Sequence, residues 1–394
     1  MRKSWKIIFL ISASLLILAA VLLIVSPGND RTGIDALYKE AMDQRMHGRF
    51  EESNATFQRM LDTYKLTRRE RKIFTRFMAQ NAFHSGDYRA AATYYATIRE
   101  KDALAQTLAG LPPQSMERPD SDISVPFEID TLGLDQDYHG MCIRVNAVIG
   151  GKRAQFVLDN GCVDYCYVTE TFAKEHGVRP VGLETEAHFV GGTTPTWVGI
   201  ADSLTVGELT IRNPLFQVVP DYAFDIPGLN LNAIMGSNFF RLAGEIQFLN
   251  KEHRIVFPGQ QEDRDANLTV QGHIFVDVSI DGETLPFVLD LGSANTALNS
   301  DYLKRHKEAI LATCPVDTIK IGAIGKGGIM EIVGYKVESV LFSANGGSFE
   351  KDATYIAPPG FISVPDSFGF LGADFILSFD KAVMNLQKMY LYVE

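Results

Sequence analysis

The sequence has no excess of positive charge and few cysteines, and both shortages narrow what the chain can be. Its 394 residues include 37 Lys and Arg against 48 Asp and Glu, which gives a net charge of −11. Because such a chain repels phosphate backbones, we expect no nucleic-acid partner. Four cysteines are too few for a disulfide scaffold at this length, and 46% hydrophobic residues indicate a globular protein rather than a disordered one.

Several motifs of hydrolases and metal sites are also missing. The sequence has no Gly-x-Ser-x-Gly turn, no His-Glu-x-x-His motif and no Walker-type phosphate loop. Cys162, Cys166 and His176 are close in sequence, but no second cysteine pair or His-x-x-x-His spacing completes a zinc site. We therefore expect no metal and no other cofactor, and we expect the cysteines to be buried thiols or to form one disulfide.

The N-terminus carries a long apolar run. Residues 7–25 are all apolar or small, and they follow a basic start that contains Arg2, Lys3 and Lys6. As a helix this run would extend about 28 Å, close to the hydrocarbon thickness of a bilayer. We predict that residues 1–30 are a single-pass membrane anchor with the C-terminal bulk outside the cytoplasm, in the periplasm if the source is bacterial. The alternative is a cleaved signal peptide and a secreted protein, although the run ends in a poor cleavage site.

Residues 31–110 have a helical pattern, with aromatic and aliphatic residues three and four positions apart. Two stretches, residues 48–57 and 86–95, each start with a glycine, have an aromatic residue two positions later and end on an aromatic residue. This spacing resembles the turn and second helix of a tetratricopeptide repeat. We predict a small all-α region of two degenerate helical hairpins, which serves either as a partner-binding surface or as a spacer.

A short motif occurs twice in the rest of the chain. Residues 156–161 read Phe-Val-Leu-Asp-Asn-Gly and residues 287–292 read Phe-Val-Leu-Asp-Leu-Gly. In both, strand-forming residues run directly into an acid and a glycine, which is how a buried strand delivers a carboxylate to a tight turn. One Asp-x-Gly is an ordinary turn sequence. Because it is repeated, we predict that Asp159 and Asp290 are a catalytic pair.

The surroundings of the two acids are repeated as well. Each acid is preceded by a hairpin and followed by a short helix with a hydroxyl cap, an apolar-apolar-glycine segment and a closing pair of strands. Four matches in the same order indicate a duplication into two units of domain size, residues 129–262 and 263–394. The proline-rich, polar residues 111–128 before them are predicted to be a linker.

This combination resembles the aspartic peptidases, and the compact units are similar to retropepsin-like domains fused in tandem. The resemblance implies a mainly β fold of two closed β-barrel lobes, with one catalytic aspartate in each lobe and a peptide or protein as substrate. It also implies that Gly236 and Gly372 pack beside the acids. The flap hairpins that close over the substrate would carry Gly191 and Gly192 in the first lobe and Gly325 and Gly327 in the second.

The chemistry implied by the resemblance needs the two acids as a unit. Carboxylates about 3 Å apart share one proton, so one acts as base and the other as acid on a water that attacks a peptide carbonyl. Gly161 and Gly292 leave room for backbone donors to approach the carboxylates.

Two positions depart from the pattern of the family. The family has Thr or Ser after each acid to brace the lobes, whereas this chain has Asn160 and Leu291. An Asn amide can donate and accept, but Leu can do neither, and each buried backbone group left unpaired costs about 1–3 kcal/mol. Ser293 fits the family's hydroxyl that supports the carboxylate, and Cys162 does not. The expected function is a membrane-anchored aspartic endopeptidase; the alternative is an inactive relative that holds a peptide or protein in the cleft.

Overall fold

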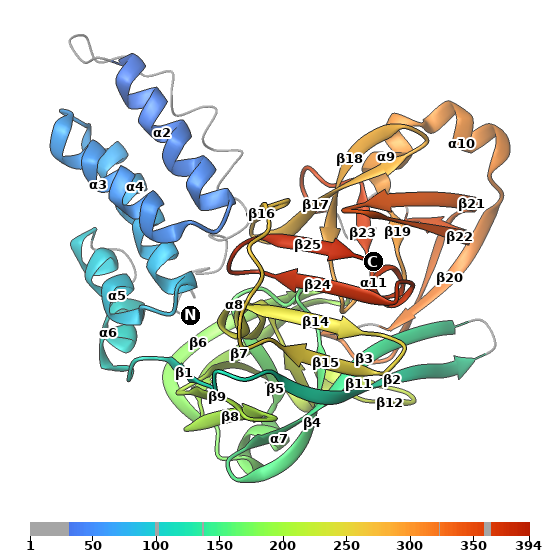
Figure 1. The fold of residues 1–394 in the computed structure, drawn as a ribbon, viewed down its shortest axis with the longest axis horizontal. Helices are drawn as coiled ribbons and strands as arrows, with labels where there is room; N and C mark the ends of the chain where they lie inside the picture. The colour runs from blue at the N-terminus through green and yellow to red at the C-terminus, as the bar shows by residue number, and fades with distance from the viewer. Residues whose placement is uncertain (1–30, 99–101, 136–137, 323, 358–363) are drawn as a thin grey trace, which may run out of the picture. The chain divides into compact units, whose positions relative to one another are not determined.

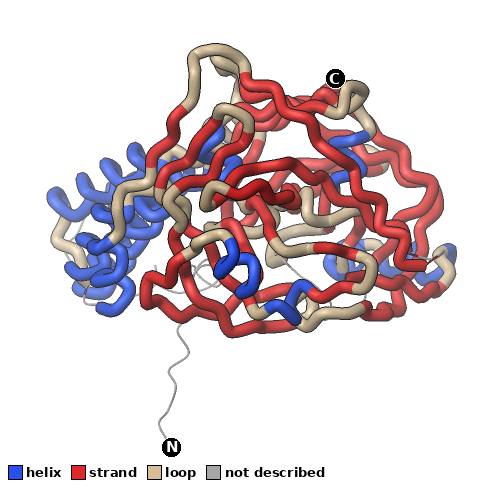
Figure 2. The backbone as a smooth tube through the Cα atoms, turned by 90° about the horizontal axis from the view of Figure 1, so that it is seen from below, coloured by secondary structure: helices blue, strands red, loops and turns tan. Residues whose placement is uncertain are grey.

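The structure, a computed structural model, describes residues 31–98, 102–135, 138–322, 324–357 and 364–394. The chain divides into two compact units. One contains Met1–Gln114 with two short segments, Val181–Thr185 and Val270–Gly272, and the other contains the remaining residues up to Glu394. Helices make up the described part of the first 114 residues, whereas strands dominate the later part of the chain (Figure 2).

The helical region begins at residue 31. Its helices are α2 (Arg31–Met46), α3 (Phe50–Thr63), α4 (Arg68–His84), α5 (Tyr88–Thr97) and α6 (Asp102–Gly110). The predicted turn glycines, Gly48 and Gly86, lie between α2 and α3 and between α4 and α5, with φ angles of 69° and 78° that favour glycine. The ring of Phe57 is fully buried and stacks on those of Phe74 and Phe77. The region is helical with turns at these glycines, and its likeness to tetratricopeptide repeats stays a prediction.

The predicted membrane anchor, residues 1–30, lies outside the described residues. Among those that the structure does describe, no helix is both long enough and apolar enough to cross a bilayer.

The second unit consists of two lobes built from the strands after residue 114. The first lobe contains β1 (Ser115–Glu117), β2 (Ile123–Asp135), β3 (Tyr138–Ile149), β4 (Lys152–Leu158), β5 (Cys166–Thr169), β6 (Arg179–Phe189), β7 (Gly192–Ile200), β8 (Ser203–Val206), β9 (Leu209–Arg212), β10 (Leu215–Val219), β11 (Asp225–Ile226), β12 (Leu229–Asn230), β13 (Ala233–Met235), β14 (Glu245–Leu249) and β15 (Arg254–Phe257). Its helices are α7 (Glu170–Glu175), the 3-10 helix η1 (Asp221–Phe224) and α8 (Ser237–Ala243).

The second lobe repeats this order of elements. It contains β17 (His273–Ile280), β18 (Glu283–Leu289), β19 (Ala297–Leu298), β20 (Val316–Gly322), β21 (Ile329–Ala344), β22 (Gly347–Ile356), β23 (Gly369–Leu371), β24 (Lys381–Asn385) and β25 (Tyr390–Val393), with helices α9 (Ser300–Arg305), α10 (Lys307–Thr313) and α11 (Ala373–Leu377). The strand β16 (Leu268–Gln271) precedes it.

The two lobes have the same strand pairing around the acids. The hairpin β3–β4 corresponds to β17–β18, and the strand that delivers each acid pairs in parallel with a short apolar strand, β13 or β23. In the second lobe a pairing between β17 and β21 closes a ring of strands, and in the first lobe β3 pairs with β8. The predicted duplication is therefore present in the pairing of the strands and not only in the sequence.

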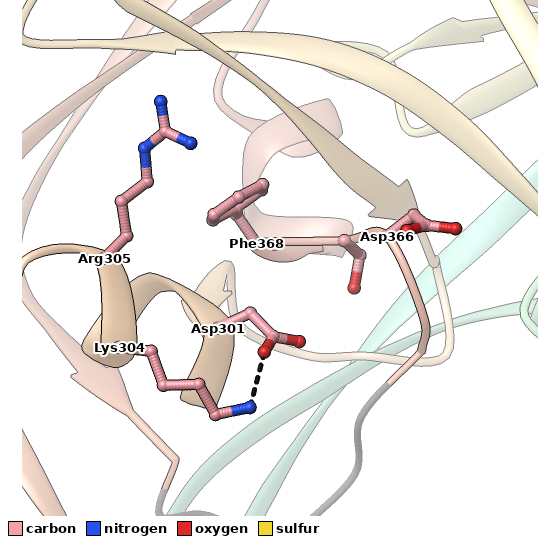
Figure 3. Close-up of a pocket in the computed structure, with 6 residues that line it drawn as sticks. Asp301, Lys304, Arg305, Asp366 and Phe368 are labelled. Carbon is pink, nitrogen blue, oxygen red and sulfur yellow. Dashed lines mark hydrogen bonds and ion pairs between the residues drawn. The ribbon is translucent and has the colours of Figure 1, made fainter.

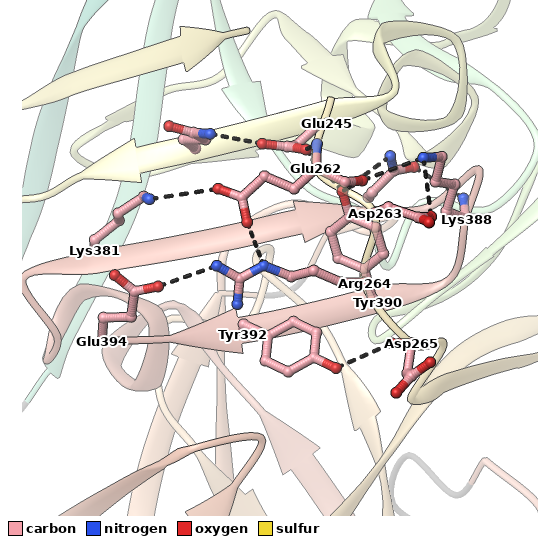
Figure 4. A network of polar contacts seen from close by, with 12 residues as sticks. Glu245, Glu262, Asp263, Arg264, Asp265, Lys381, Lys388, Tyr390, Tyr392 and Glu394 are labelled. Carbon is pink, nitrogen blue, oxygen red and sulfur yellow. Dashed lines mark hydrogen bonds and ion pairs between the residues drawn. The ribbon is translucent and has the colours of Figure 1, made fainter. Parts of the chain in front are cut away.

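A shared sheet joins the lobes. Strand β14 of the first lobe pairs with β24 of the second, so that β25, β24, β14, β15 and β2 are consecutive neighbours (Figure 1). Beneath it the segment between the lobes is fixed by polar contacts (Figure 4). The fully buried Glu245 accepts hydrogen bonds from the Tyr390 hydroxyl at 2.7 Å and from the Glu262 backbone N–H at 2.6 Å. Arg264 pairs with both Glu262 and Glu394. These contacts tie the connecting segment to strand β14 of the first lobe and to the C-terminal end of the second.

Two sequence predictions need correction here. Strands β1 and β2 lie partly or wholly inside residues 111–128, which had the composition of a linker. In β2 the alternating Ile123, Val125 and Phe127 are buried, and the polar residues around them hid this period of two.

The helix after Asp290 is capped by the amide oxygen of Asn299, which accepts from Asp301 N, and not by the predicted hydroxyl. The helix after Asp159 does have the predicted hydroxyl cap, Thr169.

Candidate functional site

The two predicted catalytic acids occupy equivalent places in the two lobes. Asp159 follows β4 directly and Asp290 follows β18. The backbone N–H of Asp159 donates to Met235 O at 3.0 Å, and that of Asp290 donates to Leu371 O at 3.0 Å. Each acid is thus fixed at the point where its strand crosses the short apolar strand of the same lobe.

The Asp-x-Gly turns face each other across the lobe boundary. A Cβ atom at Gly161 would lie 2.3 Å from Asp290 Oδ1, and one at Gly292 would lie 2.2 Å from Asp159 Cγ. Only glycine leaves room for the opposite carboxyl group at these two positions. The sequence predicted that these glycines leave room for backbone donors, and the Gly292 backbone N–H does donate to Asp290 Oδ1 at 2.9 Å. The carboxyl group of the opposite lobe, however, limits the space at these two positions more strictly.

The two carboxyl groups lie in one environment, which disfavours the charge on both. Burial raises the pKa of both above the usual range of aspartate. At Asp290 the charge of Asp159 adds to the effect of burial, and the pKa of Asp290 rises to about 7. At Asp159 hydrogen bonds from Cys162 and from the Asp290 side chain oppose the rise of the pKa caused by burial. Because neighbouring carboxyls titrate as a pair, the raised pKa values belong to the dyad as a unit, and burial together with mutual repulsion favours its protonated forms over the doubly charged one.

Of the two residues that follow the acids, Asn160 is the one whose side chain forms hydrogen bonds to the opposite lobe. Asn160 is 1% exposed, and its Nδ2 donates to Leu289 O at 2.7 Å while its Oδ1 accepts from Leu291 N at 2.8 Å. A single amide therefore makes both a donated and an accepted hydrogen bond to the opposite lobe. The side chain of Leu291, which is fully buried, contributes only apolar packing. The absence of a hydroxyl at both positions, noted from the sequence, is thus compensated by Asn160 alone.

The groups that support the carboxylates differ from the sequence prediction. The Cys162 thiol donates to Asp159 Oδ2 at 3.1 Å, and the Cys162 backbone N–H donates to Asp159 Oδ1 at 3.1 Å. Burial and the nearby Asp159 charge raise the pKa of Cys162 well above its usual range, so it remains a thiol that can donate. The Ser293 hydroxyl instead donates to Asn295 O at 2.9 Å. The prediction that the Ser293 hydroxyl supports a carboxylate was therefore wrong, because the serine side chain turns towards its own loop. Cys162 does not have the hydroxyl of the family's pattern, but its thiol supports Asp159.

Replacing Cys162 with Ala should narrow the pH range of activity from the acid side. The thiol bond stabilises the charged form of Asp159, so its loss raises the pKa of Asp159 and moves the acid limb of the pH profile to higher pH. We expect Cys162→Ser, which keeps a donor, to restore the wild-type profile. The measurement is kcat/KM for a cleaved peptide between pH 3 and 8. Superimposable profiles for Cys162→Ala and the wild type would show that the thiol has no such effect.

The remaining predicted site residues form two groups, the glycines beside the acids and the glycines of the predicted flaps. Gly236 and Gly372 pack against the loops that follow the acids: a Cβ at Gly236 would lie 1.8 Å from Tyr165 O, and one at Gly372 would lie 2.7 Å from Ser293 O. The flap glycines lie at the turns of two hairpins, β6–β7 and β20–β21. These are Gly191 and Gly192 in the first lobe and Gly325 and Gly327 in the second. The two turns contact each other, and their contact with substrate stays a prediction.

Three other side chains near the dyad were not found from the sequence. His273, at the start of β17, lies near Asp290 and Asp164; burial lowers the pKa of His273, and the charges of the two acids oppose this. In the second lobe Asp374 Oδ1 accepts from the backbone N–H and the hydroxyl of Thr296, both at 2.7 Å. The Thr296 hydroxyl in turn accepts from Gly372 N at 3.1 Å. None of these residues belongs to a local motif that could have identified it.

The four cysteines, Cys142, Cys162, Cys166 and Cys314, are free thiols. Among the residues that the structure describes, no three His, Cys, Asp or Glu side chains are grouped so that they could hold a metal ion.

A surface pocket of about 450 Å³ lies in the second lobe (Figure 3). Its lining consists of Asp301, Lys304, Arg305, Asp366, Ser367 and Phe368. Its basic groups have partners, since Lys304 Nζ lies 2.7 Å from Asp301 Oδ1 and the Arg305 guanidinium pairs with Glu283 and lies over the Phe368 ring. Neither aspartate of the dyad lines this pocket, so the pocket has no part in the chemistry of the two acids.

The fold and the dyad define a class of protein: a two-lobed β structure in which equivalent strands each deliver one aspartate to a shared site. In agreement with this, residues 145–239 match a family model described as aspartyl protease. The matched segment runs from β3 into α8 and includes Asp159, Asn160 and Gly236. The predicted resemblance to the aspartic peptidases is thus confirmed. No curated protein sequence matches the chain significantly.

The solved structures similar to this chain include two proteins named as aspartic proteases and one named as a globulin. The aspartic proteinase of Irpex lacteus has 13% identity and a TM-score of 0.45, over 69% of this chain and 96% of that one. The basic 7S globulin of soybean has 11% identity and a TM-score of 0.41, over 69% and 94%. A retropepsin-like aspartic protease from Rickettsia conorii has 13% identity and a TM-score of 0.23, over 37% and 93%. These likenesses are too distant to decide function, so the site itself must carry that argument.

Proposed function

We propose that the protein is an aspartic endopeptidase that cleaves peptide bonds with water activated by Asp159 and Asp290. The observation that carries the proposal is the packing of each acid against the glycine of the other lobe, which brings the buried Asp159 carboxyl and the half-buried Asp290 carboxyl together. A lone buried carboxylate is costly, and a facing pair is useful mainly where an acid and a base are needed side by side.

The surroundings assign different parts to the two acids. Asp159 accepts from the Cys162 thiol and backbone N–H, which favour its charged form, so it acts as the base that takes a proton from water. Asp290 holds the shared proton and donates it towards the oxygen of the attacked carbonyl. When the C–N bond breaks, the proton taken by Asp159 moves to the leaving nitrogen, and one hydroxyl of the intermediate returns its proton to Asp290 as the carbonyl re-forms, so that the dyad regains its starting state.

The location of this activity rests on the sequence alone. The apolar run in residues 7–25 supports a single-pass anchor, with the two lobes outside the cytoplasm and a peptide or protein substrate there. Secretion after cleavage of the same segment is the alternative, and the helical hairpins could in either case present a surface to a protein partner.

One observation favours a second candidate function. The Leu291 side chain can form no hydrogen bond to the first lobe, so the side-chain brace between the lobes is one-sided. An inactive relative that holds an extended peptide between its lobes would tolerate this loss more easily than an enzyme whose acids must stay level.

A pH profile of peptide cleavage separates the two functions. The full-length protein is incubated with an unbiased peptide library from pH 3 to 9, and the products are identified by mass spectrometry. Because the pKa of Asp290 is about 7, we expect kcat/KM to fall about tenfold per pH unit above neutrality as the shared proton is lost. On the acid side it falls as Asp159 is protonated. Peptides that bind but are not cleaved at any pH would instead support the binding module.

A further inference from the structure

The helical region has a charge of the opposite sign to the rest of the chain. Residues 31–114 contain 14 Lys and Arg against 10 Asp and Glu, whereas residues 115–394 contain 20 against 37. Three arginines in the first turn of α4 have exposed side chains, and we call them the α4 basic patch: Arg68, Arg69 and Arg71. A lysine lies on either side of them in the sequence, at positions 65 and 72. The start of α4 is therefore strongly basic in a protein that is acidic as a whole.

The one acid within this turn, Glu70, is engaged with other groups. Its carboxylate accepts from the backbone N–H and the hydroxyl of Thr67, at 2.8 and 2.7 Å, and so caps α4. It also forms an ion pair with Arg31 at 2.6 Å. Within the patch, Arg71 donates to the backbone carbonyl of Tyr64 at 3.5 Å, which leaves its charge unneutralised. The patch therefore presents positive charge to whatever lies beside it.

The ion pair between Arg31 and Glu70 places the patch beside the first residue of α2. The pair belongs to a packed contact between α2 and α4 (Figure 1). Ile34 of α2 is buried in one apolar cluster with Phe74 of α4, and the ring of Tyr38 stacks on that of Phe74 with centroids 5.9 Å apart. Because the packing continues along both helices, the start of α4 lies next to the start of α2.

The start of α2 follows the apolar run of the sequence after a few residues. The run ends at Val25, and the stretch of chain from Val25 to Arg31 can span at most about 22 Å. With residues 7–25 in a bilayer, as in the anchor of the proposed function, Arg31 lies within this distance of the hydrocarbon boundary. The headgroup layer occupies roughly 6 Å of it. The length of the connecting chain therefore keeps the α4 basic patch within reach of the lipid headgroups.

We propose that the α4 basic patch binds the anionic phospholipid headgroups of the membrane that holds the anchor. The proposal rests on the anchor of the proposed function and not on its peptidase chemistry. Guanidinium groups pair with phosphate through two parallel hydrogen bonds, which suits arginine to this partner. Each basic group close to an anionic bilayer favours binding about fivefold. Three arginines together hold the helical region on the bilayer, so this region is a membrane-surface element and not only a spacer.

Chemical modification of arginine tests the proposal in the full-length protein. The protein is placed in nanodiscs of phosphatidylcholine alone, or of an equimolar mixture of phosphatidylcholine and phosphatidylglycerol. It is treated with phenylglyoxal, and modification of each arginine is followed by mass spectrometry. We expect the three patch arginines to react at least about fivefold more slowly in the anionic nanodiscs at low salt. The difference should vanish at about 1 M salt, where the Debye length is about 3 Å.

An arginine outside the patch provides a matched control. Arg89 is exposed at the start of α5, beyond the far end of α4 and about 25 Å along that helix from the patch, so it should react alike in both nanodiscs. Arg69→Gln should reduce the protection of Arg68 and Arg71 at least about twofold, and Arg89→Gln should leave it unchanged. Equal modification of the patch arginines in both nanodiscs would overturn the proposal and leave an acidic protein as their partner. Protection that persists at high salt would also overturn it.

An alkaline carbonate wash of vesicles that contain the protein separates the patch from the anchor. The wild type and the triple variant Arg68→Gln/Arg69→Gln/Arg71→Gln should both stay in the vesicles, because the apolar span and not the patch resists extraction. Release of the wild type would show that the anchor is wrong and would overturn the proposal with it. Retention together with equal arginine modification would overturn the patch alone. Neither measurement depends on peptide cleavage, so failure of the proposed peptidase activity remains a separate result.

Discussion

Asp290→Asn is expected to abolish peptide cleavage and at the same time to stabilise the fold above pH 6. The substitution keeps the shape of the side chain but removes the shared proton that the acid donates to the carbonyl oxygen. Loss of general acid catalysis alone is worth about 100- to 10,000-fold, and we expect kcat to fall at least about 1,000-fold because the base also loses its coupled partner.

The gain in stability follows from the direction of the pKa shift. The pKa of Asp290 is raised from 3.8 to about 7 in the folded protein, so between these pH values the folded state binds more protons than the unfolded state. Its contribution to the free energy of unfolding is fully present below about pH 4 and is lost as the pH rises through about 7. At pH 8 the wild type therefore bears two facing charges, at a cost of roughly 1–3 kcal/mol in a site that water partly reaches. Asn removes one charge and can donate to Asp159.

The measurements are peptide cleavage and thermal unfolding at pH 5 and pH 8. We expect the midpoint of unfolding of Asp290→Asn to exceed that of the wild type by a few degrees at pH 8, with a smaller difference at pH 5. Asp281→Asn is the matched control, because it removes the same charge at an exposed turn with a φ angle of 51° that Asn accepts. Cleavage by Asp290→Asn at the wild-type rate would show that Asp290 is not the acid.

The features that could be predicted from the sequence are those encoded within a few residues of each other. The two Phe-Val-Leu-Asp stretches predicted β4 and β18, since apolar residues before Asp and Gly are a local strand-and-turn signal. The hairpins before the acids and the turn glycines Gly48 and Gly86 were predictable for the same reason. Repetition then identified both lobes, because each lobe confirms the interpretation of the other.

The features that could not be predicted depend on contacts between distant parts of the chain. Cys162 and Ser293 follow the two Asp-x-Gly triplets at the same position, yet only the Cys162 side chain reaches its carboxylate. Which of the two does so is decided by the orientation of each loop in the folded protein. The packing of Ile324, in the turn between β20 and β21, against the first lobe is likewise set by the meeting of two hairpins that are far apart in sequence. The polar composition around β2 also led to the wrong prediction of a linker, because it hid the three buried apolar residues of this strand.

Asn160 shows how one such distant contact changes the judgement of the site. From the sequence, Asn160 and Leu291 together indicated a weakened brace between the lobes. The structure places both ends of the Asn160 amide on backbone groups of the second lobe, with Leu289 O as acceptor at 2.7 Å and Leu291 N as donor at 2.8 Å. Because the Leu291 side chain has no polar atom, the Asn160 side chain makes both of these bonds.

Asn160→Ala should therefore be among the most damaging substitutions outside the dyad. It leaves Leu289 O and Leu291 N buried without these partners, at about 1–3 kcal/mol each, so we expect the free energy of unfolding of the two-lobed unit to fall by roughly 2–6 kcal/mol. The acids next to these groups would lose their alignment, and kcat should fall at least about 100-fold with KM less affected. Asn160→Thr should recover most of both losses, because one hydroxyl can accept from Leu291 N and donate to Leu289 O.

Denaturant unfolding followed by tyrosine and tryptophan fluorescence, together with cleavage kinetics, measures these effects. Asn232→Ala is the matched control: it removes an exposed asparagine of the same lobe whose amide donates to the nearby Asn230 side chain at 2.8 Å, so it should change stability by less than about 1 kcal/mol. Asn160→Asp adds a sharper test. Its carboxylate can still accept from Leu291 N but can no longer donate to Leu289 O, and its charge near the dyad should raise the pKa of Asp290 further and carry the alkaline limb to higher pH. If Asn160→Ala were as stable and active as Asn232→Ala, the lobes would be held level by the shared β14–β24 sheet alone, and the residue after each acid would be dispensable in this chain.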